Sequence, residues 1–370
     1  MTNQQNKTDY AAILAHGKQF LDNSDSEACL NFLIPILKEQ EALDGFASAS
    51  SNGLLLETIQ LAGEAFLDQG NTPEAYPLLQ VAANADPSGG LGGIEKFLWL
   101  GQILGSRDGI KSYEQGIEGL KREISQATTS IENPDIIFKK KKLCDAYCGI
   151  IEIWMTDLCM EPEAEASCDN LITQAMFVDS ANPENWNVMG SIRISQQRND
   201  DAKSALSKSW DLYHQQFSNT PSALRIQEQQ QQLIPSLIRL AQNSMEVTLF
   251  RNVVEITAEI QRLDDQVAES YYLHGLARAE LYKKLMEEAN AASSPDEHNR
   301  LIREANKNAV RARDAWETLL KLVTEEPDLV DPELAPTVTD NLKSLPESIS
   351  SDDYDSSDEE DEDIDVNDLE

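Results

Sequence analysis

The stretch PENWNVMGSIRISQQRNDDAKSALSKSW, residues 183–210, has the most informative spacing in the chain. Its apolar and small residues recur at helical intervals on both sides of a polar break, which predicts a helix, a turn and a second helix. Gly190 has no side chain and Ala202 only a methyl group, so two antiparallel helices can approach closely there, while Trp186 and Leu206 fill the remaining volume. Such a hairpin cannot bury its apolar faces alone, so the stretch predicts neighbouring hairpins.

Related spacing recurs along the chain. The clearest second copy is residues 56–87, where Gly63 and Ala75 take the two small positions. Such spacing, with W-x2-L-G-x2-Y in the first helix and A-x3-F in the second, is typical of tetratricopeptide repeats. The other expected units, some of them irregular, are 10–40, 94–120, 143–177, 235–261 and one that begins at residue 268. The sequence therefore predicts an all-α tetratricopeptide-repeat solenoid of about seven helix-turn-helix units.

The distance between Phe97 and Trp186 is irregular for such an array. It is 89 residues, or 21 more than two repeat periods of about 34. We expect the additional residues in longer helices and loops around 128–138 and 155–165.

The composition limits the partners. Hydrophobic residues make up 41% of the 370, which suits a folded domain, and the formal net charge is -35. That charge repels bare DNA and anionic membrane surfaces, so we expect no direct nucleic-acid or membrane partner and a basic protein partner instead. Five cysteines at irregular spacing indicate a reducing compartment, and the polar N-terminus shows no signal peptide. These features predict localisation in the cytoplasm, the nucleus or both.

Charge also sets the expected domain limits. Residues 325–370 contain 19 acidic residues and a single basic one, Lys343. We expect this tail to be disordered, as well as residues 1–9, with the solenoid between them at 10–324. The tail has two open interpretations. It can be a solubilising segment without a dedicated partner, or an acidic segment whose electrostatic attraction speeds association with a basic client.

The first helices of the hairpins are expected to line a groove. In repeat packing these helices form the inner face, and their outward positions carry several acids one turn apart. An ordinary solvated surface is the alternative, but solenoids use this face to bind extended peptides. The expected groove residues are Glu57, Gln60, Glu64, Asp68, Glu95, Gln102, Glu184, Asn187 and Ser191.

The basic run at residues 139–142, four lysines, has three interpretations. It can be a nuclear localisation signal, a set of ion-pair partners for the acidic face, or the start of a charged helix.

Catalytic and metal sites are not predicted. The histidines His16, His214, His274 and His298 are far apart and lack nearby ligand partners. Cys144 and Cys148 lie one helical turn apart, which is more typical of a buried core than of a metal site. We therefore predict no catalytic residue, no metal and no cofactor, and a protein that is not an enzyme.

The order of these segments resembles a known family. A clean repeat at 56–87, GGIEKFLWLGQ at 92–102, SYEQGIEGL at 112–120, PENWNVMGSI at 183–192 and the acidic C-terminus are similar to the fungal assembly chaperones of large-subunit ribosomal protein four. The resemblance implies a client: the basic internal loop of that newly made protein, captured on the concave face, protected and escorted to the nucleus for ribosome biogenesis. It also implies a nuclear import receptor as a possible further partner, and a location in cytoplasm and nucleus.

Two other binding classes remain open, a histone chaperone with interrupted repeats and a general tetratricopeptide scaffold. A co-chaperone for heat-shock protein tails is disfavoured. It needs Lys, Asn and Arg to clamp a terminal carboxylate, whereas the groove positions here are Glu57, Gln60 and Glu64.

Overall fold

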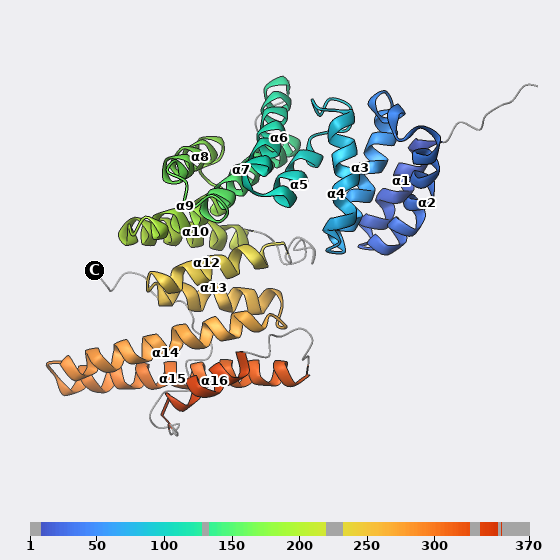
Figure 1. Cartoon of the computed structure of the whole chain (residues 1–370). Coiled ribbons are helices and arrows are strands. Elements are labelled where there is room, and N and C mark those ends of the chain that lie inside the picture. Colours follow the sequence, from blue (N-terminus) through green and yellow to red (C-terminus); the bar gives the residue numbers. More distant parts are fainter. Residues whose placement is uncertain (1–8, 128–132, 220–231, 326–333, 347–348, 350–370) are drawn as a thin grey trace, which may run out of the picture. The chain divides into compact units, whose positions relative to one another are not determined.

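The computed structural model describes residues 9–127, 133–219, 232–325, 334–346 and 349, and its regular elements in these ranges are helices (Figure 1). The chain divides into two compact units, residues 1–185 and 186–370, which we describe one at a time. None of the described helices combines the length and the apolar composition needed to cross a membrane.

The N-terminal unit is a stack of helical hairpins. Each helix packs against the next one in the chain, and α1 and α5 also pack against α3 and α7, respectively. This pattern is that of consecutive helix-turn-helix repeats. The elements are α1 (Tyr10–Asp22), α2 (Ser26–Asp44), the short 3₁₀ helix η1 (Ala47–Ser50), α3 (Gly53–Asp68), α4 (Thr72–Ala85), α5 (Glu95–Leu104), α6 (Ser106–Gln126), α7 (Pro134–Met155) and α8 (Ala164–Val178).

The small residues mark the close approaches, as the spacing predicts. A Cβ atom on Gly63 of α3 would lie 2.8 Å from the Leu79 side chain of α4, too close for a real contact. The two helices therefore pack at a separation that a larger residue would not allow. Gly105 alone joins α5 to α6, and its φ of 56° lies in a region that favours glycine.

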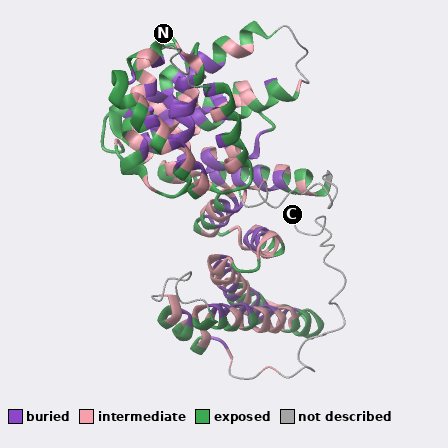
Figure 2. Cartoon of the chain, turned by 90° about the vertical axis from the view of Figure 1, so that its right-hand side faces the viewer, coloured by how far each residue is buried: buried purple, intermediate pink, exposed green. Residues whose placement is uncertain are grey.

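The C-terminal unit continues with the same kind of hairpin. Gly190 faces Leu206, and Ala202 and Leu206 are completely buried. Buried positions alternate with exposed ones along the helices (Figure 2). Further along, α14 and α15 form a long pair in which Gly275 lies against Trp316. The elements are α9 (Pro183–Ser195), whose first turn belongs to the N-terminal unit, α10 (Asn199–Asn219), α12 (Ile234–Glu246), α13 (Phe250–Leu263), α14 (Ala268–Ala291), α15 (Pro295–Glu325) and α16 (Leu334–Lys343).

The additional residues before Trp186 lie where the spacing places them. Helices α6 and α7 have 21 and 22 residues, longer than the 16 and 14 of α3 and α4. The connection at 156–163 coincides with one expected insertion, whereas residues 128–132 of the other lie outside the described residues.

The predicted limit of the tail is wrong in one respect. Helix α16 packs against α15, with Val338 fully buried and Leu345 nearly so, in one apolar cluster with Trp316 and Leu319. These side chains provide apolar burial that the acidic composition of the segment conceals. Residues 1–8 and 350–370 lie outside the described residues, so their disorder stays a prediction.

Candidate functional site

Carboxylates from the first helices of successive hairpins lie near one another in the N-terminal unit. We call them the acidic face: Glu57, Glu64 and Asp68 of α3, Glu95 of α5, Asp145 of α7 and Glu184 of α9. Burial raises the pKa of Glu64, the charges of Asp68 and Glu95 raise it further, and Lys142 and Lys18 partly offset the shift. The neighbouring hairpins therefore bring predicted site residues into electrostatic contact, because each contributes the same side of its first helix.

Lys142 of α7 is the internal counter-ion of the acidic face. Its Nζ lies 2.6 Å from Oε1 of Glu95 and 4.7 Å from the centre of the Phe138 ring, one helical turn away. Burial acts against ionisation of Glu95, but the hydrogen bond and the charge of Lys142 hold the pKa of Glu95 below its usual value. The face thus already holds one ammonium group between a carboxylate and an aromatic ring.

Asp145 extends the acidic face one turn beyond Lys142. Burial raises the pKa of Asp145 to about 6; Glu184 adds to the shift, while Lys141 and Lys142 oppose it. Its side chain keeps an exposed surface, so the shift reflects protein packed around the carboxylate rather than complete removal from water. A cation brought to this point would favour the ionised form.

Glu57 and Asp68 lie at the edge of the face nearest α1 and α2. The Nζ of Lys18 is 3.3 Å from Oε2 of Glu57, and the Oγ of Ser26 donates a hydrogen bond of 3.2 Å to Asp68. Both contacts are solvent-exposed and contribute little to stability, so these carboxylates can exchange partners readily.

The expectation that Gln60 points outward is wrong. Its side chain is buried, and its Nε2 donates to the carbonyl oxygen of Gly92 at 2.5 Å. The glycine-rich connection between α4 and α5 folds back over α3 and covers it. The same connection is fixed by a buried ion pair, in which Nζ of Lys96 lies 3.1 Å from Oδ2 of Asp86. Burial opposes ionisation of Asp86, but the backbone N–H groups of the connection and Lys96 lower its pKa to about 2.

Asn187 is also buried rather than exposed, because α12 of the C-terminal unit packs against it. Its Nδ2 donates to the carbonyl oxygen of Ser236 at 3.2 Å, and it accepts a hydrogen bond from Asn243. Asn243 donates to Oγ of Ser191 as well, at 2.7 Å. Asn187 and Ser191 therefore join α9 to α12 in the C-terminal unit. Gln102 of α5 is exposed, as expected of a groove residue.

Two lysines of the 139–142 run serve as ion-pair partners. Lys139 lies 3.0 Å from Glu123 of α6, and Lys142 pairs with Glu95. This agrees with the second interpretation of the run, while a nuclear localisation signal stays a prediction.

Asp145 and Phe138 were not predicted, although they share one stripe of α7 with Lys142, at intervals of three and four residues. That spacing indicates a shared helix face and could have pointed to these residues. The register of this hairpin was unclear from sequence, because Cys148 and Gly149 compete for its small position.

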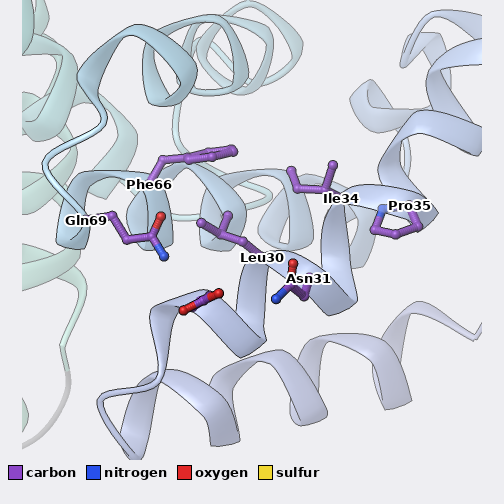
Figure 3. A pocket seen from close by; sticks show the side chains of 7 residues that line it. Leu30, Asn31, Ile34, Pro35, Phe66 and Gln69 are labelled. Atoms are coloured by element: carbon purple, nitrogen blue, oxygen red, sulfur yellow. The ribbon is translucent and has the colours of Figure 1, made fainter.

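An open depression on the same unit has a different character. It lies between α2 and α3, and Figure 3 shows Leu30, Ile34 and Phe66 among its lining side chains. Pro35 within α2 also lines it. Its lining is mainly apolar, which separates it chemically from the acidic face.

Metal-binding groups are not evident in the described ranges. No set of three or more His, Cys, Asp or Glu side chains there is arranged to hold an ion. Cys144 is buried and accepts a hydrogen bond from Asn185 at 3.4 Å, in keeping with a core position.

No protein-family model matches the chain. A probable assembly chaperone of rpl4 from Schizosaccharomyces pombe is 35% identical over 185 residues, which are 50% of this chain and 51% of that protein. A protein of the same name from Emericella nidulans is 30% identical over 243 residues, 64% of this chain and 57% of that protein. A solved structure of an assembly chaperone of RpL4, Acl4 residues 1–338, is 25% identical, with a TM-score of 0.62.

The chain is similar in sequence and in fold to assembly chaperones of rpl4. The likeness to the solved chaperone covers 77% of this chain and all of that one, so the predicted all-α repeat fold and the predicted resemblance are confirmed. The chain spans about half the length of the two curated relatives it matches. All three similar proteins are named as chaperones, a class of binding proteins.

Proposed function

We propose that this chain is an assembly chaperone that binds ribosomal protein L4, rpl4, through the acidic face of its N-terminal unit. The observation that carries the proposal is the convergence of Glu64, Glu95 and Asp145, from three successive hairpins, around the ammonium group of Lys142. The names of the similar proteins support rpl4 as the client, and the clustered carboxylates support the acidic face as its binding surface.

The charges explain how a basic segment would be held. Burial raises the pKa of Glu64 and Asp145, and repulsion from neighbouring carboxylates raises it further. A lysine or arginine of the client relieves this repulsion, whereas the phosphates of RNA add to it. The face therefore discriminates in favour of a polycationic peptide and keeps that peptide from binding RNA nonspecifically.

Phe138 adds an apolar element to the same surface. Its side chain is 55% exposed, and its ring already contacts one cation, the ammonium of Lys142. Arginine stacks on aromatic rings and pairs with carboxylates at the same time, so we expect arginine side chains of the client at this position.

The proposal includes where the protein acts. Ribosomal proteins are made in the cytoplasm and assembled in the nucleus, so a dedicated escort is expected in both compartments. A nuclear import receptor is then the expected additional partner, and no direct contact with nucleic acid or membrane is required.

Co-purification tests the proposal. The chain is co-expressed with tagged rpl4 or, in a parallel arm, with histones H3–H4, and the bound fraction is quantified. The triple variant Glu64→Lys, Glu95→Lys, Asp145→Lys is expected to lose rpl4. The control variant Glu39→Lys, Glu41→Lys, Glu74→Lys makes the same change in charge at exposed positions away from the acidic face and is expected to keep it.

Three results would contradict the proposal. Retention of histones in place of rpl4 would favour the histone-chaperone alternative, and capture of neither would leave only a general scaffold. Equal loss of rpl4 in both charge-reversal variants would show that net charge, rather than this face, binds the client.

A further inference from the structure

Exposed apolar side chains border the acidic face on one side. Eight large apolar side chains are exposed in the part of the chain that the structure describes, and four of them lie at this border. Single exposed apolar residues are normal on a protein surface, whereas several gathered beside a charged site point to a contact surface. We call the four residues the apolar edge: Leu54, Leu91, Ile137 and Phe138.

The apolar edge follows the N-terminal ends of the first helices. Leu54 lies in the first turn of α3, three residues before Glu57 and therefore on the same side of that helix. Ile137 and Phe138 lie near the start of α7, two turns before Asp145. Because each unit is a helix-turn-helix hairpin, the first helices of successive units point the same way, and their starts lie at the same border of the face.

Leu91 joins Leu54 at this border. A Cβ atom on Gly53 would lie 4.0 Å from Cβ of Leu91, so the connection between α4 and α5 passes beside the start of α3. The backbone N–H of Leu91 donates to Oδ2 of Asp86 at 3.1 Å, and the same oxygen is paired with Lys96. The exposed side chain of Leu91 is therefore carried by an ordered backbone, and little conformational entropy is lost when a partner covers it.

Phe138 connects the apolar edge to the carboxylates. The Nζ of Lys142 lies 4.7 Å from the centre of its ring and 2.6 Å from Oε1 of Glu95. Glu95 is the first residue of α5 and follows Leu91 by four residues. One ammonium group thus contacts both surfaces, so a single bound segment can contact both.

The spacing of the helices sets the length of a segment that follows the edge. Two steps between neighbouring first helices separate α3 from α7, roughly 20 Å or slightly more at the usual packing distance. An extended chain covers that distance in about six to eight residues, and its alternate side chains point to the same side. Two apolar side chains at this separation can therefore reach the two ends of the edge at once.

The charge beside the edge limits what can bind there, because the neighbouring carboxylates favour a basic partner. We propose that the client segment is amphipathic: two apolar side chains, six to eight residues apart, pack against Leu54 with Leu91 and against Ile137, and lysine or arginine residues between them pair with the acidic face. The inference rests on the proposed function, since it describes the client of that same face. The apolar contacts distinguish this client from basic segments that lack them, and they persist at salt concentrations that weaken ion pairs.

Labelled peptides and the full-length chain test the inference by fluorescence anisotropy. The peptide KRLRKRKRLKR has leucines six residues apart, and KRSRKRKRSKR has the same charge with serine in their place. The leucine peptide is expected to bind roughly tenfold more tightly, because two leucine side chains are partly removed from water. Both peptides are expected to weaken between low and high salt, with the ratio of their affinities preserved. In KRKLRKLRKRK the leucines are three residues apart, and most of the gain is expected to be lost.

The protein variant Leu54→Ser, Leu91→Ser, Ile137→Ser removes three residues of the edge. Phe138 stays in place, because its ring also contacts cations. The variant is expected to bind the leucine and serine peptides within about twofold of each other, and to keep its affinity for the serine peptide.

The matched control is Leu43→Ser, Met160→Ser, Phe177→Ser. It replaces three apolar residues that are more exposed than those of the edge and lie on α2, on the connection after α7 and on α8. This control is expected to keep the preference for leucine. The comparison of peptides on the wild type needs no substitution and remains decisive if a variant unfolds.

Equal affinities of the wild type for the leucine and serine peptides would overturn the inference, as would equal losses of the leucine preference in the edge variant and its control. Sedimentation of the chain without peptide adds an independent result: a dimer that dissociates in the edge variant alone would assign the edge to a second copy of the chain. Binding of rpl4 without any leucine preference would count against this inference alone. A leucine preference without binding of rpl4 would count against the proposed client alone.

Discussion

Replacing Lys142 with Met separates client binding from stability, because the two are expected to change in opposite directions. The substitution keeps the length of the side chain and removes the internal counter-ion of Glu95. In the wild type, a client cation about 5 Å from the ammonium group of Lys142 is repelled by about 0.8 kcal/mol in a water-like medium. The substitution removes this repulsion, so the affinity for the client at low salt is expected to rise about fourfold.

The free energy of unfolding is expected to fall only slightly in this variant. The side chains of Lys142 and Glu95 are 26% and 38% exposed, so their ion pair contributes no more than about 1 kcal/mol to the free energy of unfolding. The pKa of Glu95, which Lys142 holds down, is expected to rise in the variant.

Fluorescence anisotropy with a labelled peptide of alternating arginine and lysine, at several salt concentrations, measures the affinity, and competition with rpl4 relates it to the client. Lys111→Met is the control, since Lys111 is 73% exposed on α6 and lies outside the acidic face. Weaker peptide binding by the Lys142 variant would refute the idea that this lysine competes with the client. An equal rise in affinity in both variants would show that the effect comes from net charge and not from the position of Lys142.

Four further predictions follow from single contacts. Peptide binding by the wild type is expected to weaken as the pH falls through about 6, since protonation of Asp145 removes its charge, and Asp145→Asn is expected to flatten that profile in anisotropy titrations. Lys96→Met leaves the Asp86 carboxylate buried without its partner and is expected to lower the free energy of unfolding by about 3 kcal/mol in urea melts. Because the pKa of Asp86 is lower in the folded state, its contribution is complete above about pH 4 and is lost as the pH falls towards 2. Gly190→Val forces a Cβ to within 2.4 Å of Leu206 and is expected to cost about 3 kcal/mol, seen as a lower Tm. Val338→Asp is expected to detach α16 and expose residues 334–346 to protease, without loss of the hairpins before it.

The repeat spacing was predictable because close approach of two helices allows few residue types. A Cβ on Gly63 or Gly190 would collide with Leu79 or Leu206, so the small residues report the packing directly. The spacing of these small residues along the chain predicts the order of the hairpins and the place of the irregular unit.

Polar residues were less predictable, because the same side chain can face water or a neighbouring backbone. Gln60 is covered by the connection between α4 and α5, and Asn187 by α12. The helical periodicity of the sequence predicts neither contact. Asp145 was missed since its helix had no unambiguous small residue to fix the register. In α16 the acidic composition concealed the few apolar residues that bury it.

The buried pair between Asp86 and Lys96 has a consequence for how this unit unfolds. In repeat proteins, each hairpin interacts with its nearest neighbours, and stretches of the array can open separately. Here the connection itself is bound at both ends: Asp86 ends α4, Lys96 belongs to α5, and Gln60 of α3 bonds to Gly92 between them. The hairpins α3–α4 and α5–α6 are thereby coupled into one cooperative block, whose amides are expected to exchange hydrogen together.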